Sequence, residues 1–334
     1  MSNIALVGFG RIGRDLFRQS LSNQELNIVS ISDIADKKNL LYLLRYDSIY
    51  GKLDTEILEY DDGIIVNGNK IFFNNWRDSN DADWDALNVD IVVLATGKPK
   101  TKEDIDNHIS KGCKKVIIAS TPVNFDDVQI YIPGANEASI DFSKSSISLG
   151  SNTANAVAPI LNVINNKFGV ERAFLTTVHG YSNSNRLADV AGEGLRLNRA
   201  AGENIIPGIT KSSDVIEYVL PFMKNKVSSS SMTVPVPDGS VVDLNIDLTH
   251  SASSEEINNL LVSASQNELK DIIGTTYDPI VSSDVVKSRY SGLVDCLSTM
   301  DINNKKIKLI VWFDNGWGYT ARIIDTLKKL NMEL

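Results

Sequence analysis

The sequence contains few cysteines and no long apolar segment. Its 334 residues include only two cysteines, Cys113 and Cys296, which lie far apart and form no CxxC pair. A disulfide framework is therefore excluded, and a reducing compartment is expected. No apolar run approaches the ~18 residues of a membrane span, and no basic segment with a cleavage site precedes the first predicted strand. We predict a cytoplasmic protein without a metal site.

Positive charge is also scarce. The chain carries 33 Lys+Arg against 42 Asp+Glu, which gives a formal net charge of -9. An acidic chain without a Lys/Arg run is a poor partner for nucleic acids and anionic membranes, so neither is expected to bind. Small molecules and further copies of the chain are the expected partners. The length of 334 residues favours two domains, because single cores stop growing at roughly 250–300 residues.

The residue pattern changes near position 150. Before it, apolar runs alternate with helical periodicity, which predicts an α/β domain with a parallel, doubly wound sheet. After it, a helix and long alternating strands predict an α+β domain with a mainly antiparallel sheet, and the serines at Ser228–Ser231 are interpreted as a turn. The predicted strands are Ile4–Val7, Asn27–Ser32, Asp90–Ala95, Lys115–Ala119, Arg172–Val178, Ser231–Val236, Ser240–Leu248 and Lys308–Phe313. The predicted helices are Leu16–Leu21, Asn39–Leu44, Lys102–Lys111, Asn152–Lys167, Ser254–Gln266 and Tyr319–Leu330.

A glycine-rich turn follows the first predicted strand and opens a helix. Its glycines permit a tight turn and let a pyrophosphate approach the helix N-terminus. Asp33 ends the second strand about 20 residues later, where a carboxylate accepts a hydrogen bond from a ribose 2′-OH and repels a 2′-phosphate. The sequence therefore predicts a Rossmann domain that binds NAD in preference to NADP. The candidate residues are Gly8, Gly10, Arg11, Ile12, Gly13 and Asp33.

Seven further segments follow this turn in a characteristic order. They are YDSIYGKL (Tyr46–Leu53), ATGK (Ala95–Lys98), TTVHGYS (Thr176–Ser182), RAAGENIIP (Arg199–Pro207), VPVPDGSVVDL (Val234–Leu244), YDPIVSSD (Tyr277–Asp284) and WFDNGWGY (Trp312–Tyr319). With GFGRIGR at the turn, the chain resembles the glyceraldehyde-3-phosphate dehydrogenases from Ile4 to the final helix.

The resemblance implies an organisation and further site residues. An NAD domain would span residues 1–150 and be completed by the C-terminal helix at 316–334, and a catalytic and oligomerisation domain would span 151–315. The protein would be a homotetramer, in which the loop around Asp189–Asn198 borders a neighbouring subunit's cofactor. Thr96 and Asn315 would bind NAD, Asn315 through the nicotinamide carboxamide.

The sequence departs from the family at the catalytic cysteine. The family's segment reads Ser-Asn-Ala-Ser-Cys-Thr-Thr-Asn and is followed shortly by Ala-Pro. Counting back from Ala158-Pro159 without gaps places Thr153 at the first Thr and Ser151 at the Ser before the cysteine. The cysteine position is Asn152, so the family's nucleophile is absent.

No other residue is an evident substitute for this cysteine. Cys113 and Cys296 are interpreted as small buried hydrophobes, and neither Ser151 nor Thr153 has a sequence-visible base. Asn152 suits the N-cap of the helix that begins here, and the same amide can also hydrogen-bond a substrate. Both interpretations stay open.

His179 is the candidate proton-transfer group. In the family this histidine pairs with the cysteine; here it would act directly on a substrate oxygen that Asn152 orients. A leftover structural histidine is the alternative. The other two histidines, His108 and His250, stand in ordinary helical and strand-end contexts.

The chain keeps only some of the residues that form the two anion sites of the family it resembles. Ser182 keeps a hydroxyl and Arg196 matches an arginine, but Thr233 replaces the Arg before Val-Pro. In the second anion site Lys211 stands where the family has glycine, and a solvated lysine is its alternative interpretation. The candidate substrate-binding residues are Ser151, Thr153, Ser182, Arg196, Thr210, Lys211 and Thr233.

These observations favour one activity and leave two others open. Oxidation of an aldehyde through an acyl intermediate needs a nucleophile, whereas hydride transfer between a carbonyl and an alcohol needs only NAD and a proton-exchanging group. We therefore expect an NAD-dependent oxidoreductase that reduces the carbonyl of a small, phosphorylated or otherwise anionic sugar or polyol precursor. A non-catalytic NAD-binding relative that acts as a sensor or structural partner, and a phosphorylating aldehyde dehydrogenase, are the alternatives.

Overall fold

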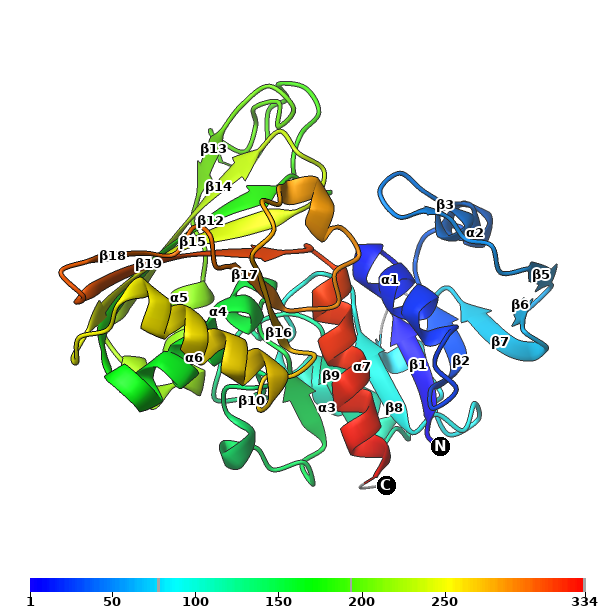
Figure 1. Ribbon diagram of the computed structural model, residues 1–334. Helices are drawn as coiled ribbons and strands as arrows, with labels where there is room; N and C mark the ends of the chain where they lie inside the picture. The colour runs from blue at the N-terminus through cyan, green and yellow to red at the C-terminus, as the bar shows by residue number, and fades with distance from the viewer. Residues whose placement is uncertain (77–78, 193, 333–334) are drawn as a thin grey trace. The chain divides into compact units, whose positions relative to one another are not determined.

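The computed structural model describes residues 1–76, 79–192 and 194–332, which form two compact units (Figure 1). The first unit comprises Met1–Tyr131, Ala138–Gly150 and Thr320–Leu334, and the second comprises Ile132–Glu137 and Ser151–Tyr319. The assignment of NAD binding to residues 1–150 with 316–334, and of catalysis to 151–315, stays a prediction.

The first unit is built on a sheet with strand order β10-β11-β9-β8-β1-β2-β7-β6-β5. From β10 through β7 in this order, each strand pairs in parallel with the next, as the apolar runs predict. The antiparallel pairs β5–β6 and β6–β7 extend the sheet and were not predicted. The strands are β1 (Asn3–Val7), β2 (Asn27–Ser32), β5 (Ile57–Tyr60), β6 (Gly63–Val66), β7 (Asn69–Asn74), β8 (Ile91–Leu94), β9 (Lys115–Ile118), β10 (Gln129–Ile130) and β11 (Ser146–Ser148). The helices are α1 (Arg11–Ser20), α2 (Lys37–Arg45) and α3 (Lys102–Ser110), and β3 (Tyr46–Asp47) pairs with β4 (Gly51–Lys52) as a separate ribbon.

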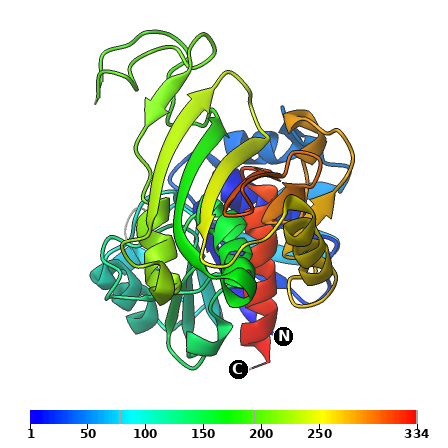
Figure 2. The ribbon, with the colours of Figure 1, turned by 60° about the vertical axis from the view of Figure 1, so that its left-hand side comes forward.

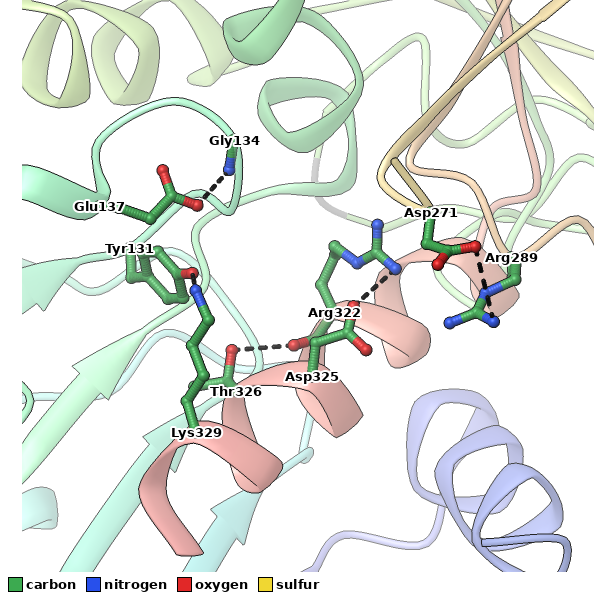
Figure 3. Close-up of polar contacts among 9 residues, drawn as sticks. All are labelled: Tyr131, Gly134, Glu137, Asp271, Arg289, Arg322, Asp325, Thr326 and Lys329. Carbon is green, nitrogen blue, oxygen red and sulfur yellow. Dashed lines mark hydrogen bonds and ion pairs between the residues drawn. The ribbon is translucent and has the colours of Figure 1, made fainter. Parts of the chain in front are cut away.

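The C-terminal helix α7 (Trp317–Asn331) belongs to the first unit from Thr320 onward. The guanidinium of Arg322 in this helix is fully buried. It pairs with the carboxylate of Asp325 at 2.7 Å, one helical turn further on (Figure 3). Lys329 donates a hydrogen bond to the Tyr131 hydroxyl and lies over the same ring. These contacts attach the last helix to a strand end nearly 200 residues away in the sequence.

The second unit is built on a sheet with strand order β13-β14-β12-β15-β19-β17-β16, and β18 also pairs with β19. Most neighbours are antiparallel, as predicted, but the pairs β12–β14 and β16–β17 are parallel. The strands are β12 (Val170–Gly180), β13 (Ile206–Gly208), β14 (Val227–Val234), β15 (Ser240–Leu248), β16 (Ile273–Thr276), β17 (Gly292–Asp295), β18 (Met300–Ile302) and β19 (Lys306–Phe313). The helices are α4 (Asn152–Phe168), α5 (Ser212–Val219) and α6 (Ser254–Gln266).

The three helices of the second unit pack together on one face of its sheet (Figure 1). Small residues bring α4 close to the strands: a Cβ at Gly292 of β17 would lie 3.0 Å from the carbonyl oxygen of Ala156. The chain between β12 and β13 extends beyond the ends of the strands (Figure 2). The prediction of a turn at Ser228–Ser231 was wrong, because these serines lie within β14, paired with β12.

Two further properties concern the described residues only. Within them, no helix is both long and apolar enough to cross a membrane. The same residues contain no cluster of three or more His, Cys, Asp or Glu side chains that could hold a metal ion.

Candidate active site and cofactor cavity

The glycine-rich turn leaves no room for a side chain at Gly8 or Gly13. Gly8 has φ +94°, and a Cβ there would lie 2.7 Å from the Ala95 backbone. A Cβ at Gly13 would lie 2.2 Å from the Gly8 carbonyl oxygen, so glycine lets helix α1 pack on its own turn. At Gly10, the N-cap of α1, a Cβ would meet nothing within 4 Å, and no side chain caps the helix. No side-chain oxygen of the N-cap residue therefore accepts from the first amides of α1, which leaves them for an anion.

Asp33 is fixed at the edge of this turn. Its Oδ2 accepts a hydrogen bond from the Phe9 amide at 2.6 Å, and its Oδ1 accepts one from the Ala35 amide at 2.9 Å. It lines a cavity of about 400 Å³ together with Gly8, Gly10 and Thr96. The structure thus brings these predicted cofactor residues together. Arg11 and Ile12 form the first turn of α1 beside them.

Helix α4 begins at the segment that aligns with the family's cysteine. Ser151 is its N-cap, because the Ser151 hydroxyl accepts a hydrogen bond from the Ala154 amide at 3.1 Å. The interpretation of Asn152 as the N-cap was wrong: Asn152 is the first residue of the helix. Its Oδ1 accepts from the Thr153 amide at 2.8 Å, and its Nδ2 donates to the Asn315 carbonyl oxygen at 3.1 Å. One amide N–H of Asn152 remains for a ligand.

A chain of hydrogen bonds joins Asn152 to the end of strand β12. Asn152 donates to the carbonyl of Asn315, and the side-chain Oδ1 of Asn315 accepts a hydrogen bond from the Ser240 hydroxyl. The Ser240 hydroxyl in turn accepts from the Gly180 amide at 3.2 Å. The residue before Gly180 is His179. The two candidate catalytic residues are therefore held in one network, although they come from different elements.

His179 has a defined orientation at the end of β12. Its Nδ1 lies 2.6 Å from the Gly180 carbonyl oxygen, a contact that requires a proton on Nδ1. In the neutral ring, Nε2 is then the nitrogen without a proton. Its neighbour in the parallel strand β14 is Thr233, in register with His179. The position where the family carries an arginine thus adjoins the candidate catalytic histidine, and here it offers only a hydroxyl.

Hydroxyl groups gather where helices α4 and α5 begin. The Ser212 hydroxyl lies 2.8 Å from that of Thr210 and 3.4 Å from that of Ser151. Ser212 is 2% exposed, and the sequence analysis missed it. Lys211 is exposed at the N-cap position of α5, and its side chain does not cap the helix. Two helix N-termini and a lysine therefore surround the cluster, an arrangement that favours an anion.

The remaining candidate substrate residues lie in different parts of the second unit. Thr153 is buried in the first turn of α4, beside Asn152. The Ser182 hydroxyl is paired with that of Ser184 at 2.9 Å. Arg196 is exposed in the loop between β12 and β13, and its guanidinium forms no ion pair with the residues that the structure describes. No contact brings Arg196 to Ser182 among those residues.

Both cysteines are unsuited to nucleophilic catalysis. Burial raises the pKa of the Cys113 thiol to about 12, and its sulfur donates to the His108 carbonyl at 3.2 Å. Burial also raises the pKa of Cys296. A reactive cysteine needs a lowered pKa and partial exposure, so the interpretation of both as structural residues agrees with their surroundings.

Two buried carboxylates flank Asn315. Asp238 accepts hydrogen bonds from the backbone N–H groups of Asn315 at 2.9 Å and Gly239 at 2.8 Å. Asp314 accepts from the amides of Gly316 and Trp317. Burial, and then the charge of Asp238, raise the pKa of Asp314 to about 6. Sequence reasoning missed this pair, although both residues lie in motifs quoted above.

Asn315 retains an unsatisfied donor. Its Nδ2 is buried without a hydrogen-bond partner among the described residues, and a Cβ at Gly180 would lie 3.0 Å from it. Such a donor costs free energy unless a ligand accepts from it. A carbonyl oxygen of a ligand suits this position, and the assignment of that ligand to the nicotinamide carboxamide stays a prediction.

Comparison with known proteins identifies the family of this chain. Residues 2–102 match the family description "Glyceraldehyde 3-phosphate dehydrogenase, NAD binding domain", and residues 151–315 match its C-terminal domain. The chain belongs to the glyceraldehyde 3-phosphate dehydrogenase family. It is 40% identical to the glyceraldehyde-3-phosphate dehydrogenase of Geobacillus stearothermophilus over 96% of each chain. It is 38% identical to that of Borreliella burgdorferi over 98% of this chain and 99% of the relative.

The family assignment confirms the resemblance, the fold class and the cofactor. The glyceraldehyde 3-phosphate dehydrogenase family consists of NAD-dependent oxidoreductases, and the first unit carries the family's NAD binding domain. NAD is therefore the cofactor that the glycine-rich turn and Asp33 fit. The roles of the individual site residues stay predictions.

Asp33 is expected to determine the choice between NADH and NADPH. We expect NADH to bind about 10- to 100-fold more tightly, because NADPH loses a hydrogen bond to a carboxylate and brings a phosphate beside it. Asp33→Asn should narrow this ratio at least several-fold in fluorescence titrations. Asp36→Asn, which keeps an N-cap for α2 outside the cavity, should leave it unchanged. Equal affinity of the unmodified protein for both cofactors would remove the argument from Asp33.

The Asp238–Asp314 pair is expected to make stability depend on pH. Because the pKa of Asp314 is raised in the folded state to about 6, the folded state binds more protons than the unfolded state above pH ~4, and stability falls as pH rises toward and through 6. Asp238→Asn removes the neighbouring charge. It should raise the free energy of unfolding by about 1–3 kcal/mol at pH 8 relative to the unmodified protein, with little difference at pH 4.

The measurement is the melting temperature of each variant from pH 4 to 8. Asp243→Asn is the control, because Asp243 lies in β15, the strand that follows Asp238, but is partly exposed and paired with Lys308. A gain for Asp238→Asn that is the same at every pH would contradict the coupling between the two carboxylates.

Proposed function

We propose that this protein reduces the carbonyl of a small anionic sugar or polyol precursor to an alcohol, with NADH as the reductant. The observation that carries the proposal is Asn152 at the start of α4, tied by hydrogen bonds to the loop beside His179. An amide nitrogen is not a useful nucleophile, so a carbonyl substrate keeps its sp² carbon here. NADH supplies the hydride when bound.

His179 would supply the proton that the product alkoxide needs. Its Nδ1 is held by the Gly180 carbonyl, which directs Nε2–H of the imidazolium toward a ligand. An imidazolium can give this proton to the alkoxide, and the ring can take another from solvent. The second amide N–H of Asn152 would donate to the same oxygen and stabilise its developing charge; loss of one such donor elsewhere costs roughly 10²–10³ in rate.

The hydroxyl cluster would bind the anionic group of the substrate. Ser151, Thr210 and Ser212 supply hydroxyls where two helices begin, and Lys211 adds positive charge. Thr233 beside His179 has no charge to offer a second anion. We therefore infer a substrate with one strongly held anionic group rather than two. Ser182, Thr153 and Arg196 would contribute to the surrounding surface.

We also infer a homotetramer. Large apolar side chains are almost fully exposed on the loop after β12 and beside β13, with Leu187 at 91%, Leu195 at 90% and Ile209 at 100%. Exposed apolar groups in this number on one segment favour a protein–protein contact. A second copy of the chain is the partner that the family resemblance suggests.

The unmodified protein should not oxidise glyceraldehyde 3-phosphate with NAD and phosphate to an acyl phosphate at a rate typical of its relatives. Asn152→Cys should gain a trace of this activity, limited by Thr233, and iodoacetamide should abolish the gain. Asn152→Ala, which brings no thiol, should gain nothing. The measurement is NADH formation with direct detection of acyl phosphate. Robust formation by the unmodified protein that resists alkylation would contradict the proposal.

His179→Gln should lower the turnover of carbonyl reduction by about 10²–10⁴-fold, because it removes the proton donor. NADH affinity should stay nearly unchanged. The measurement is NADH consumption with the best carbonyl substrate from a panel of phosphorylated and free aldoses and ketoses. His250→Gln, at an exposed position after β15, should retain full turnover.

Two results would overturn the reductase proposal. One is full turnover of His179→Gln, and the other is the failure of every carbonyl compound to oxidise NADH. With intact NADH binding, the second result would favour a non-catalytic sensor or structural partner.

A further inference from the structure

Helix α3 places two polar side chains in the wall of the cofactor cavity. Asp104 and His108 both line the cavity that also contains Gly10 and Asp33. They are four residues apart on α3, so they lie on the same face of the helix, one turn from each other. Neither belongs to the glycine-rich motif or to the proposed substrate site.

His108 presents a hydrogen-bond donor. The Trp84 indole N–H donates to its Nδ1 at 3.2 Å, so Nδ1 is an acceptor and the proton sits on Nε2. His108 is 4% exposed, and its Nε2 makes no hydrogen bond to any residue that the structure describes. Burial, and then the charge of Lys100, lower the pKa of His108 to about 4, which keeps the ring neutral near pH 7. The remaining donor therefore has a fixed position.

Asp104 presents a hydrogen-bond acceptor. Its Oδ2 accepts from the amide and hydroxyl of Thr101, both at 3.0 Å, in the capping box of α3. Burial raises the pKa of Asp104, but the hydrogen bonds from Thr101, together with Lys100 and His108, lower it by more, so the net shift is downward. The group is thus a carboxylate, and its Oδ1 accepts no hydrogen bond from the described part of the chain.

Aromatic side chains also line the cavity that Asp104 and His108 share. Trp76 and Trp84 also line it, with ring centroids 5.2 Å apart and edge-to-face packing. Trp84 and His108 lie 5.8 Å apart. An NAD molecule with its pyrophosphate at Gly10 and its ribose at Asp33 would place its base in the rest of this cavity.

We propose that Asp104 and His108 read the adenine base of the dinucleotide. A ring nitrogen of adenine would accept from Nε2–H of His108, and the neighbouring exocyclic amino group would donate to Oδ1 of Asp104. Hypoxanthine carries a carbonyl oxygen where adenine carries the amino group, so it would meet the carboxylate with an acceptor. The pair is therefore a specificity device for adenine over its deaminated form. The inference rests on NAD as the cofactor and not on the proposed carbonyl reduction.

The test compares the affinities for NADH and nicotinamide hypoxanthine dinucleotide (reduced form), measured by titration without a substrate. The unmodified protein should prefer NADH by about 10- to 100-fold, the worth of a hydrogen bond to a carboxylate. Asp104→Asn should reduce this preference to less than about 3-fold, because an amide can present a donor to the hypoxanthine oxygen. Asn can still accept from Thr101, so the helix cap is retained.

Asp106→Asn is the matched control. Asp106 lies on the same helix, is largely exposed, pairs with Lys102 and does not line the cavity, so the preference should be unchanged. His108→Phe should weaken AMP binding about 3- to 10-fold, and His108→Gln, which keeps a donor, should recover part of this loss. Melting temperatures identify any variant that fails to fold.

Two results would overturn the proposal. One is equal affinity of the unmodified protein for the two dinucleotides. The other is an identical change for Asp104→Asn and Asp106→Asn. Because only binding is measured, neither result depends on whether the protein reduces a carbonyl.

Discussion

The hydrogen bond from the Asn152 amide to the Asn315 carbonyl links the start of helix α4 to the segment after β19. The backbone N–H of Asn315 also donates a hydrogen bond to Asp238, and its side-chain oxygen accepts one from the Ser240 hydroxyl. A cysteine at position 152 offers only a weak S–H donor to that carbonyl. Asparagine therefore replaces a nucleophile with a structural donor, and the second N–H of the same group is still available to a ligand. In the proposed function, the loss of acyl chemistry and the retention of an ordered site would have this one cause.

The charges around this network differ from one end to the other. The hydroxyl cluster of Ser151, Thr210 and Ser212 lies where two helices begin, so the local field favours an anion. At Asn315, two buried carboxylates accept hydrogen bonds from the backbone. An anionic group of the proposed substrate would therefore be attracted to the first location and repelled from the second. This polarity would orient a small substrate with its carbonyl between the two, near His179.

The sequence predicted those features that depend on local patterns. The turn at Gly8–Gly13 and the strand that ends near Asp33 were predicted correctly, because the apolar periodicity and glycine spacing are local properties. Helix α4 was also placed correctly at its start. Its N-cap was assigned one residue late, since Ser151 and Asn152 are both good caps and only the hydrogen bond to the Ala154 amide distinguishes them.

Features that depend on tertiary contacts were not predicted. The serines at Ser228–Ser231 resemble a turn in composition, but pairing with β12 makes them part of a strand. Ser212 carries no motif, and its importance arises only because α4 and α5 bring its hydroxyl near those of Ser151 and Thr210. His108 was interpreted as an ordinary helical residue, because its exposure to the cofactor cavity depends on how Trp84 packs against it.

In the proposed reaction, hydride passes directly from NADH to a carbonyl carbon that never forms a bond to the protein. The most direct test uses NADH deuterated at C4 of the nicotinamide with a panel of phosphorylated and free aldoses and ketoses. Mass spectrometry of the products should find an alcohol that carries deuterium on the former carbonyl carbon, with no product covalently attached to the protein. Labelled alcohol from none of the compounds, or a substrate trapped as a covalent adduct on the unmodified chain, would contradict the claim.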